Sequence, residues 1–430
     1  MLRRVAPSWR RTLALAGLLA LVAAGLGVGL GYAAGPSFAI YGNPHAPAVP
    51  AWLTTPLAGL APAPGEGTFT VLVLVMFASY LVVVTLAEFV GARWGIAAIL
   101  VLHAGLLLAP PILSGDVFAY LAYARLDLLQ GLDPYREAAD ATPHDPLFPF
   151  VGMKHIVSPY GPLFTLLTWG LVPLGVVGGV WALKASAVLA SLAGAGLVWS
   201  CARALGRDPL APTLFVALNP IQLVYGVGGA HNDLLMAVLV LAGVRLALAN
   251  RDSPAGAVLA AATAVKATAG LVLPFLVLGS RRPGRTLAVS AASSVLLAAA
   301  AVGVFGAAGM AGYLKVLIAQ GGFVSKYSVW ALLAGDPATE RVPDALKAAL
   351  LVAFTGATGA LLVRTWRGGD WIGGAGWAVL ALLLATTWLL PWYIALLLPL
   401  VALGGSAPLR NATHAFTALV LLTRLPLLLA

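Results

Sequence analysis

Residues 12–35 read TLALAGLLALVAAGLGVGLGYAAG, an apolar run that contains no charged side chain. A helix of about 20 residues crosses the hydrocarbon core of a bilayer, so this run is long enough to span a membrane. Basic residues precede it, as in a secretory signal, but the run is longer than the apolar core of a signal peptide. We therefore expect a retained anchor, with a cleaved signal as the alternative.

The same pattern recurs along the whole chain. Further apolar runs of spanning length occupy residues 69–90, 94–113, 180–203, 210–226, 232–249, 286–308, 345–365, 371–389 and 411–430. Residues 391–405 are short for a full crossing but can serve as one if the helix begins near Trp388. Residues 254–279 are also apolar but carry Lys266 near their centre, so they form either one imperfect span or two half-helices that meet at a polar turn. The sequence thus predicts an all-α, polytopic membrane helical bundle of about 11–13 transmembrane helices.

Composition supports a membrane protein and argues against a soluble domain, a disulfide-stabilised protein and a nucleic-acid-binding protein. Of the 430 residues, 61% are hydrophobic and 9% are charged, and the mean hydropathy is +0.96. A soluble domain carries roughly 25% charged residues. The single cysteine, Cys201, permits no internal disulfide. The net charge of +10 comes largely from arginines beside apolar runs, which is typical of topology signals, so no nucleic-acid partner is expected.

The distribution of basic residues predicts the orientation, because Lys and Arg are enriched in cytoplasmic loops. We expect residues 161–178 to lie along or dip into the outer interface instead of crossing the membrane. This choice makes the following arginines cytoplasmic: Arg203, Arg207, Arg245, Arg251, the Arg281 cluster, Arg364, Arg367 and Arg410. The prediction is a multi-pass plasma-membrane protein with a cytoplasmic N-terminus. Its outer segments are residues 36–68, 114–179, 226–233 and 309–344, together with the Pro391–Tyr393 corner.

The first large outer loop begins with SGDVFAYLAYARLDLLQGLDPY, residues 114–135. Helical spacing predicts an interfacial helix with an apolar side (Phe118, Leu121, Ala122, Leu128 and Leu129). A polar stripe would face an aqueous cavity and consists of Asp116, Tyr120, Tyr123, Asp127 and Gln130. We expect Ser114 to cap this helix, Gly131 to end it and Asp133-Pro134 to form a turn. Asp116 either complements the helix dipole, worth about 0.3–1 kcal/mol, or serves as a general base.

Other polar groups near the outer face each have two interpretations. Lys154 and His155 bind either a phosphate or anionic lipid head groups. In NPIQLVYGVGGAHNDLL, residues 219–235, His231 to Asp233 either cap the next helix or line a functional site. Lys266 either snorkels or pairs inside the bundle, or binds an anion between half-helices. The lone His103 is expected to be a hydrogen-bonded core residue.

Taken together, these motifs resemble the GT-C superfamily of polyprenyl-phosphate-sugar-dependent glycosyltransferases, and within it the bacterial polyprenol-phosphate-mannose-dependent α-mannosyltransferases. The resemblance extends from residue 95 to about residue 400. It rests on SGD (114–116), GLDPY (131–135), SPYGPL (158–163), the 219–235 run, VKATAGLVLPF (265–275) and LLPWY (389–393). It implies three regions: an N-terminal transmembrane hairpin with a Pro/Gly-rich outer loop (1–94), a GT-C-like catalytic module (95–280) and C-terminal transmembrane helices (281–430).

The resemblance also implies a function. Asp116 would be the general base of an inverting sugar transfer from a polyprenyl-phosphate donor to a glycan or lipoglycan acceptor at the outer face, with membrane lipids as further partners. Donor phosphate or sugar would contact Lys154, His155, Tyr160, His231, Asp233, Lys266, Trp392 and Tyr393. Supporting residues would be Tyr120, Tyr123, Asp127, Asp133 and Tyr135.

One departure from this scheme matters. Many superfamily members carry two adjacent acids in the first loop, whereas Val117 follows Asp116. No cofactor is therefore expected, and a divalent metal is not indicated. A transporter or flippase for a lipid-linked sugar is the alternative function, although such proteins usually show an internal repeat, and we find none.

Overall fold

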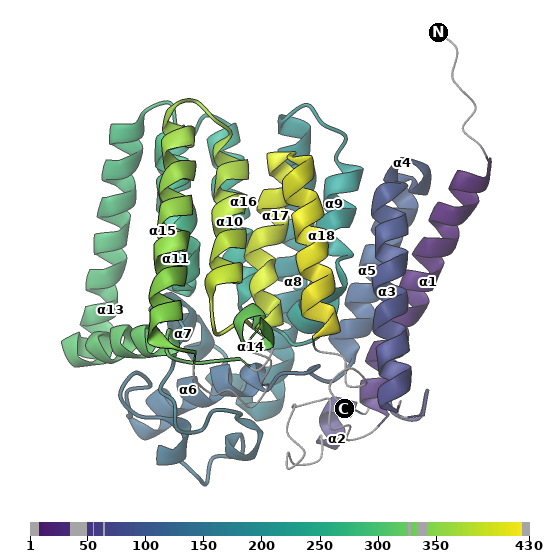
Figure 1. Ribbon diagram of the computed structural model, residues 1–430. Helices are drawn as coiled ribbons and strands as arrows, with labels where there is room; N and C mark the ends of the chain where they lie inside the picture. The colour runs from purple at the N-terminus through teal and green to yellow at the C-terminus, as the bar shows by residue number, and fades with distance from the viewer. Residues whose placement is uncertain are drawn as a thin grey trace.

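The computed structural model describes residues 8–34, 50–54, 56–62, 65–325, 328–333 and 342–423. Every regular element within these ranges is a helix, and most of the helices run side by side in one bundle (Figure 1). This confirms the predicted all-α fold. Helices suit a chain in lipid because they satisfy their backbone hydrogen bonds within one segment.

Helix lengths confirm a multi-pass membrane protein. Five of the described segments are long and apolar enough to cross a bilayer: α1 (Ser8–Ala33), α3 (Glu66–Thr85), Pro162–Ala204, α13 (Pro283–Gln320) and α15 (Asp344–Trp366). Shorter apolar segments are α5 (Ala92–Leu108), Ala267–Gly279, α16 (Trp371–Ala385) and Pro391–Gly404, which contains α17 (Ile394–Gly404). Also in the bundle are α8 (Gly175–Ala204), α9 (Leu210–Ala217), α10 (Asp233–Leu248), α11 (Asp252–Val265) and α18 (Ala407–Leu422). Three further helices are short: α2 (Ala51–Thr54), α4 (Ala87–Val90) and α14 (Val329–Leu333).

Two buried basic side chains join α5 to α8. His103 Nδ1 donates to the Ile99 carbonyl at 2.8 Å, and its Nε2 lies 2.9 Å from the Ser191 hydroxyl. These contacts confirm a hydrogen-bonded core histidine. Lys184 is 1% exposed and donates to the carbonyls of Leu106 and Ala109 at the end of α5. A cation at a helix C-terminus complements the helix dipole, so Lys184 stabilises the end of α5. Sequence reasoning did not single out this lysine.

Residues 252–279 form a helical hairpin, which decides between the two predicted alternatives. Helix α11 ends at Val265, Lys266 has an extended backbone (φ −155°, ψ 122°), and the chain returns through a 3-10 segment and α12 (Leu273–Gly279). The two ends of the hairpin meet, since the Arg281 amide donates to the Asp252 carboxylate at 3.0 Å. Lys266 therefore lies at the tip of two half-helices.

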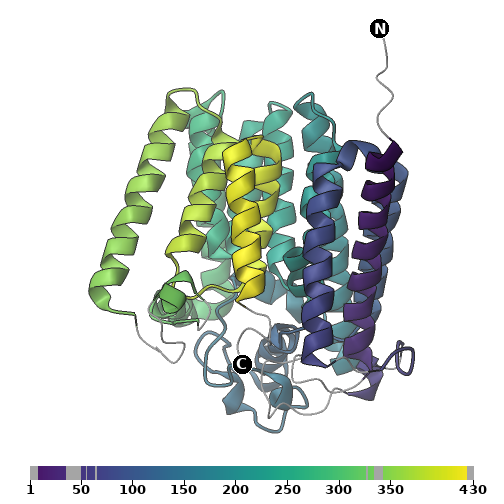
Figure 2. The ribbon, with the colours of Figure 1, turned by 45° about the vertical axis from the view of Figure 1, so that its right-hand side comes forward.

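One end of the bundle is covered by helices that lie across it. These are α6 (Asp116–Gln130), α7 (Pro162–Trp169) and the second part of α13, which bends at Gly306 (φ 70°) (Figures 1 and 2). Residues 309–320, predicted as part of an outer loop, are thus helical. Helix α13 packs on the loop after α6 through Tyr135. The Tyr135 ring lies 5.0 Å from Phe305, just before the bend, and 5.3 Å from Tyr313 in the bent part.

The opposite end of the bundle carries clustered arginines. Arg11 and Arg93 line one recess, and Arg207 and Arg410 line another. Arg251 lines a third recess with Arg281, Arg282 and Arg285. Helix α1 begins at this end (Figure 1). Among the described residues, arginines are concentrated at this end, although Arg125 and Arg136 lie at the α6 end. The concentration agrees with the charge rule, and a cytoplasmic location of the arginine-rich end remains a prediction.

Candidate active site

Helix α6 places Asp116 at its first residue. The amide of Asp116 donates to the Ser114 hydroxyl at 3.1 Å, although the capping position itself is Gly115 and not the predicted Ser114. The helix ends at Gly131, which has the left-handed conformation expected of a terminating glycine. These two boundaries fix the carboxylate of Asp116 at the junction between α6 and the bundle.

The expectation that the polar stripe of α6 faces water is corrected. Tyr120 and Tyr123 are 2% and 4% exposed, because residues 136–160 fold back over the helix. Tyr123 donates to the Ile156 carbonyl, and the ring of Tyr160 lies 4.6 Å from that of Tyr120. The stripe therefore divides: Asp116 and Tyr120 point into the protein, whereas Asp127 stays near the surface.

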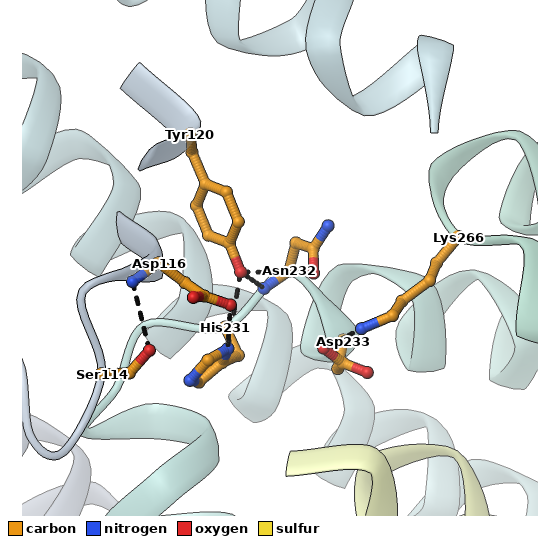
Figure 3. A network of polar contacts seen from close by, with 7 residues as sticks. All are labelled: Ser114, Asp116, Tyr120, His231, Asn232, Asp233 and Lys266. Atoms are coloured by element: carbon orange, nitrogen blue, oxygen red, sulfur yellow. Dashed lines mark hydrogen bonds and ion pairs between the residues drawn. The ribbon is translucent and has the colours of Figure 1, made fainter. Parts of the chain in front are cut away.

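A cluster of polar side chains surrounds Asp116 (Figure 3). The Nδ1 atom of His231 lies 3.5 Å from Asp116 Oδ2 and 3.5 Å from the Tyr120 hydroxyl. The Tyr120 hydroxyl also donates to the side-chain Oδ1 of Asn232 at 3.3 Å and accepts from the backbone N–H of Asn232 at 3.2 Å. Residues 112 positions apart in sequence thus meet at one point.

The turn before α10 supplies His231 and Asn232, and Asp233 is the first residue of the helix. The backbone of this turn is anchored beside α6, because the Ile112 amide donates to the Gly228 carbonyl at 2.9 Å. Asn232 occupies the predicted capping position of α10, but its side chain forms no capping hydrogen bond there. The side chains of His231, Asn232 and Asp233 instead contact other segments.

Lys266 and Asp233 form a buried ion pair. The Lys266 ammonium lies 2.7 Å from Asp233 Oδ2, and the two side chains are 17% and 2% exposed. The ammonium also lies 4.7 Å from the centre of the Tyr393 ring, a distance typical of a cation–π contact. Of the alternatives for Lys266, pairing inside the bundle is confirmed, and its remaining exposure leaves the ammonium accessible from one side.

The SPYGPL motif contacts the tip of the α11–α12 hairpin through a backbone hydrogen bond. The Gly161 amide donates to the Val265 carbonyl at 3.1 Å, immediately before Lys266. A β-carbon on residue 161 would overlap the backbone of Ala264 and Val265, so only glycine allows this approach. Tyr160, the preceding residue, lies beside Asp116 and Lys266 in the wall of a cavity.

That cavity has a polar end and an apolar wall. The polar end is lined by Asp116, Tyr160, Asp233, Lys266, Trp392 and Tyr393. The apolar wall comes from several helices and includes Met236, Leu317, Val379, Leu382, Leu383 and Leu396. Such a cavity suits an amphipathic ligand whose polar head lies at Asp116 and Lys266.

His231 lies behind Asp116 and is not part of the cavity wall. Its side chain is fully buried, and its ring stacks on that of Trp392 with centroids 3.6 Å apart and an interplanar angle of 17°. One face of Trp392 is therefore occupied by protein. The expectation that His231 contacts a donor directly is not supported by this placement.

Burial raises the pKa of Asp116 from 3.8 to about 6; the Lys266 charge opposes this rise, and the Asp233 carboxylate adds to it. Burial and Asp133 likewise raise the pKa of Asp127 to about 6. A pKa near 6 leaves a carboxylate mostly ionised at neutral pH and able to accept a proton. Because both carboxylates share this value, geometry distinguishes them: only Asp116 lines the cavity.

The remaining predicted residues lie outside the cavity wall. Lys154 contacts the Phe148 ring at 4.5 Å, and His155 Nδ1 lies 2.6 Å from Asp140 at the surface. Asp133 accepts from the Tyr135 amide at 2.9 Å and forms the predicted turn. The Tyr135 hydroxyl bonds the Tyr160 carbonyl at 2.9 Å, so it supports the cavity indirectly. In the part of the chain that the structure describes, no three His, Cys, Asp or Glu side chains are grouped for a metal ion.

Comparison with known proteins identifies relatives. A family model described as "Alpha-(1->6)-mannopyranosyltransferase, N-terminal domain" matches residues 11–282. The chain is 32% identical over 352 residues to alpha-(1->6)-mannopyranosyltransferase A of Mycobacterium tuberculosis. The aligned region covers 74% of this chain and 65% of that protein. It is 34% identical over 183 residues to the protein of the same name from Corynebacterium glutamicum, covering 40% and 36%.

These matches confirm the resemblance seen in the sequence motifs. No solved structure matches the chain. The chain spans less than two thirds of the length of the first relative and about a third of the second. The family match includes α6, the turn before α10 and the hairpin tip, so it contains Asp116, His231, Asp233 and Lys266. The chain therefore belongs to the alpha-(1->6)-mannopyranosyltransferase N-terminal domain family.

Proposed function

We propose that the protein is an integral membrane mannosyltransferase that moves mannose from a polyprenyl-phosphate donor to a glycan or lipoglycan acceptor at the outer face of the plasma membrane. One observation carries the proposal: a single cavity joins a carboxylate of raised pKa, a lysine ammonium and an apolar wall. The names of the relatives specify an α-(1→6) linkage, which we extend to this chain.

The two parts of the cavity match the two parts of the donor. A polyprenyl chain is apolar and packs against Leu382, Leu383 and Leu396, while the phosphate and sugar occupy the polar end. Lys266 is the cation at that end, so its ammonium stabilises the charge that grows on the departing phosphate.

The reaction is a single displacement. The acceptor hydroxyl oxygen forms a bond to the anomeric carbon of the mannose while the bond from that carbon to the phosphate oxygen breaks. Asp116 takes the hydroxyl proton, and the polyprenyl phosphate leaves with the bonding electron pair. Attack from the side opposite the phosphate inverts the anomeric centre, so a β-linked donor gives an α-linked product.

The direct test is transfer by the purified full-length protein in lipid vesicles. Supplied with polyprenyl-phosphate-mannose and an α-mannoside acceptor, it should form a new α-mannosidic bond, detected by mass spectrometry and α-mannosidase digestion. Movement of the donor between leaflets without any new glycosidic bond would instead identify a transporter or flippase.

Activity is expected to fall on the acid side of pH 6. A general base works ionised, so protonation of Asp116 removes it, and because burial raises its pKa to about 6 the loss begins near neutral pH. At pH 5 roughly a tenth of the carboxylate remains ionised. A profile of kcat/KM between pH 4.5 and 8, which follows the groups of the free enzyme, should therefore rise through about 6 and level off. The profile should be unchanged in Asp127→Asn, since that carboxylate titrates similarly outside the cavity.

His231 acts as a positioning residue for Asp116. His231→Phe keeps the stack on Trp392 but removes the ring nitrogen beside Asp116. We expect kcat to fall about tenfold, and the acid limb of the pH profile (the rise in activity with pH as Asp116 ionises) to move up by about one pH unit. His231→Asn places an amide nitrogen near the Nδ1 position and should restore the acid limb. The donor KM should stay constant in both variants. A raised donor KM with unchanged kcat would mean that His231 contacts the donor instead.

A further inference from the structure

The recess where the two ends of the α11–α12 hairpin meet lies at the opposite end of the bundle from Asp116. It is lined by Asn250, Arg251, Asp252, Ser253, Pro254, Arg281, Arg282 and Arg285. The hairpin brings Arg281 and Asp252 together from positions 29 residues apart in sequence. The proposed sugar transfer uses none of these groups.

The recess has an excess of positive charge that the protein does not neutralise. It contains four guanidinium groups and one carboxylate, and this carboxylate of Asp252 already accepts from the Arg281 amide at 3.0 Å. None of the four guanidinium groups forms an ion pair with a described residue. Arg125, by contrast, pairs with Asp145 at 2.9 Å. Four unpaired like charges around one hollow attract an anion.

Topology signalling alone explains the number of arginines at this end but not their convergence. Arg364 and Arg367 satisfy the same charge rule at the end of α15, yet neither lines the recess. Helices α11 and α13 also both begin here, with Arg251 and Arg282 at capping positions and no side-chain cap on either helix. Their free amide groups add to the positive potential that the guanidinium groups establish.

The surroundings favour a lipid over a free ion. Helix α13 leads away from the recess with exposed apolar side chains: Leu287 is 57% exposed, Val295 68% and Leu296 70%. A phospholipid whose phosphate lies among the arginines would therefore have a surface for its acyl chains on the same helix. Basic pockets between transmembrane helices at the membrane surface bind anionic head groups in this way.

We propose that this recess binds the phosphate group of an anionic phospholipid. Bound there, the phosphate bridges Arg251 on one arm of the hairpin to Arg281 and Arg282 on the other. Since the hairpin carries Lys266 at its tip, the lipid stabilises the element that presents the ammonium to the cavity. Only this last consequence, a dependence of activity on the lipid, rests on the proposed transfer function.

The test compares two doubly substituted full-length proteins that lose the same charge from the same end. Arg251→Gln with Arg282→Gln alters the recess, and Arg364→Gln with Arg367→Gln is the matched control. Each is purified in detergent and placed in nanodiscs of phosphatidylcholine with or without phosphatidylglycerol. Retention of phosphatidylglycerol over phosphatidylcholine is measured by native mass spectrometry, and thermal unfolding is followed alongside.

We expect the wild type and the control to retain phosphatidylglycerol selectively and to unfold at a higher temperature with it. The recess variant should lose this selectivity by about tenfold or more, with its circular dichroism spectrum unchanged. Equal losses in both variants, or no loss in the recess variant, would overturn the proposal. Inorganic phosphate that stabilises the wild type as much as phosphatidylglycerol does would also overturn it in favour of a free anion.

Binding and catalysis are separable in this design. Selective retention of phosphatidylglycerol that depends on the recess supports the site even if no mannosyl transfer is detected. Mannosyl transfer that is equal in all variants and lipids, together with selective retention, would remove only the link to Lys266.

Discussion

Asp116→Asn is expected to lower the rate of mannosyl transfer by about 10²–10⁴-fold, the usual contribution of a general base. Asparagine has nearly the same shape, and the hydrogen bond to Ser114 comes from the backbone amide of residue 116, so the helix start is retained. The amide cannot accept the acceptor proton. Purified wild type and variant, assayed with polyprenyl-phosphate-mannose at saturating acceptor, give the comparison.

Asp127→Asn provides the matched control. It makes the same substitution in the same helix and on the same polar stripe, but outside the cavity wall. Its activity should stay within about twofold of the wild type, as expected of a substitution away from the reacting groups. Near-wild-type turnover by Asp116→Asn, or equal losses in the two variants, would return Asp116 to the role of a residue that only complements the helix dipole.

Lys266→Met is expected to affect both stability and activity. It leaves the Asp233 carboxylate, which is 2% exposed, buried without its partner. Breaking a buried ion pair from one side costs about 3–5 kcal/mol, so the variant should unfold at a clearly lower temperature. Loss of the cation near the departing phosphate should also lower kcat by about 10²-fold or more.

The double variant Lys266→Met with Asp233→Asn separates these two effects. Removing both charges takes away the uncompensated carboxylate, so the unfolding temperature should recover most of the loss. The transfer rate should remain low, because no cation returns to the polar end of the cavity. Recovery of both stability and turnover would show that Lys266 serves only to pair Asp233, and the phosphate would then need another partner.

Residues 114–135 illustrate how much of the site could be predicted. Local signals give the helix itself: it ends before Gly131 as expected, and it begins at Asp116, one residue later than a Ser114 cap would start it. The environment of that stripe could not be predicted, since it depends on residues 136–160 folding back over Tyr120 and Tyr123. The spacing of the polar residues shows which face of the helix they share, but whether that face meets water depends on the fold of residues 136–160.

Lys266 and Lys184 show the same limit. Lys266 stands out in an apolar sequence, and Lys184 does not, yet Lys184 is the more deeply buried of the two. Lys184 bonds carbonyl groups at the end of another helix, and no side-chain pattern marks such a partner. Lys266 finds Asp233, 33 residues away, only because the chain reverses direction at the tip of the hairpin.

The sequence by itself determined that this protein is an α-helical membrane bundle, and it predicted that Asp116, His231, Asp233 and Lys266 lie near one face. It could do so because apolar length and the placement of arginines act locally, through transfer of each segment between water and lipid. Only the tertiary structure decided that His231 stands behind Asp116, that Lys266 pairs with Asp233, and that four arginines converge on one recess. These pairings follow from helix packing and chain reversals, where contacts between distant residues compensate the cost of burying each polar group.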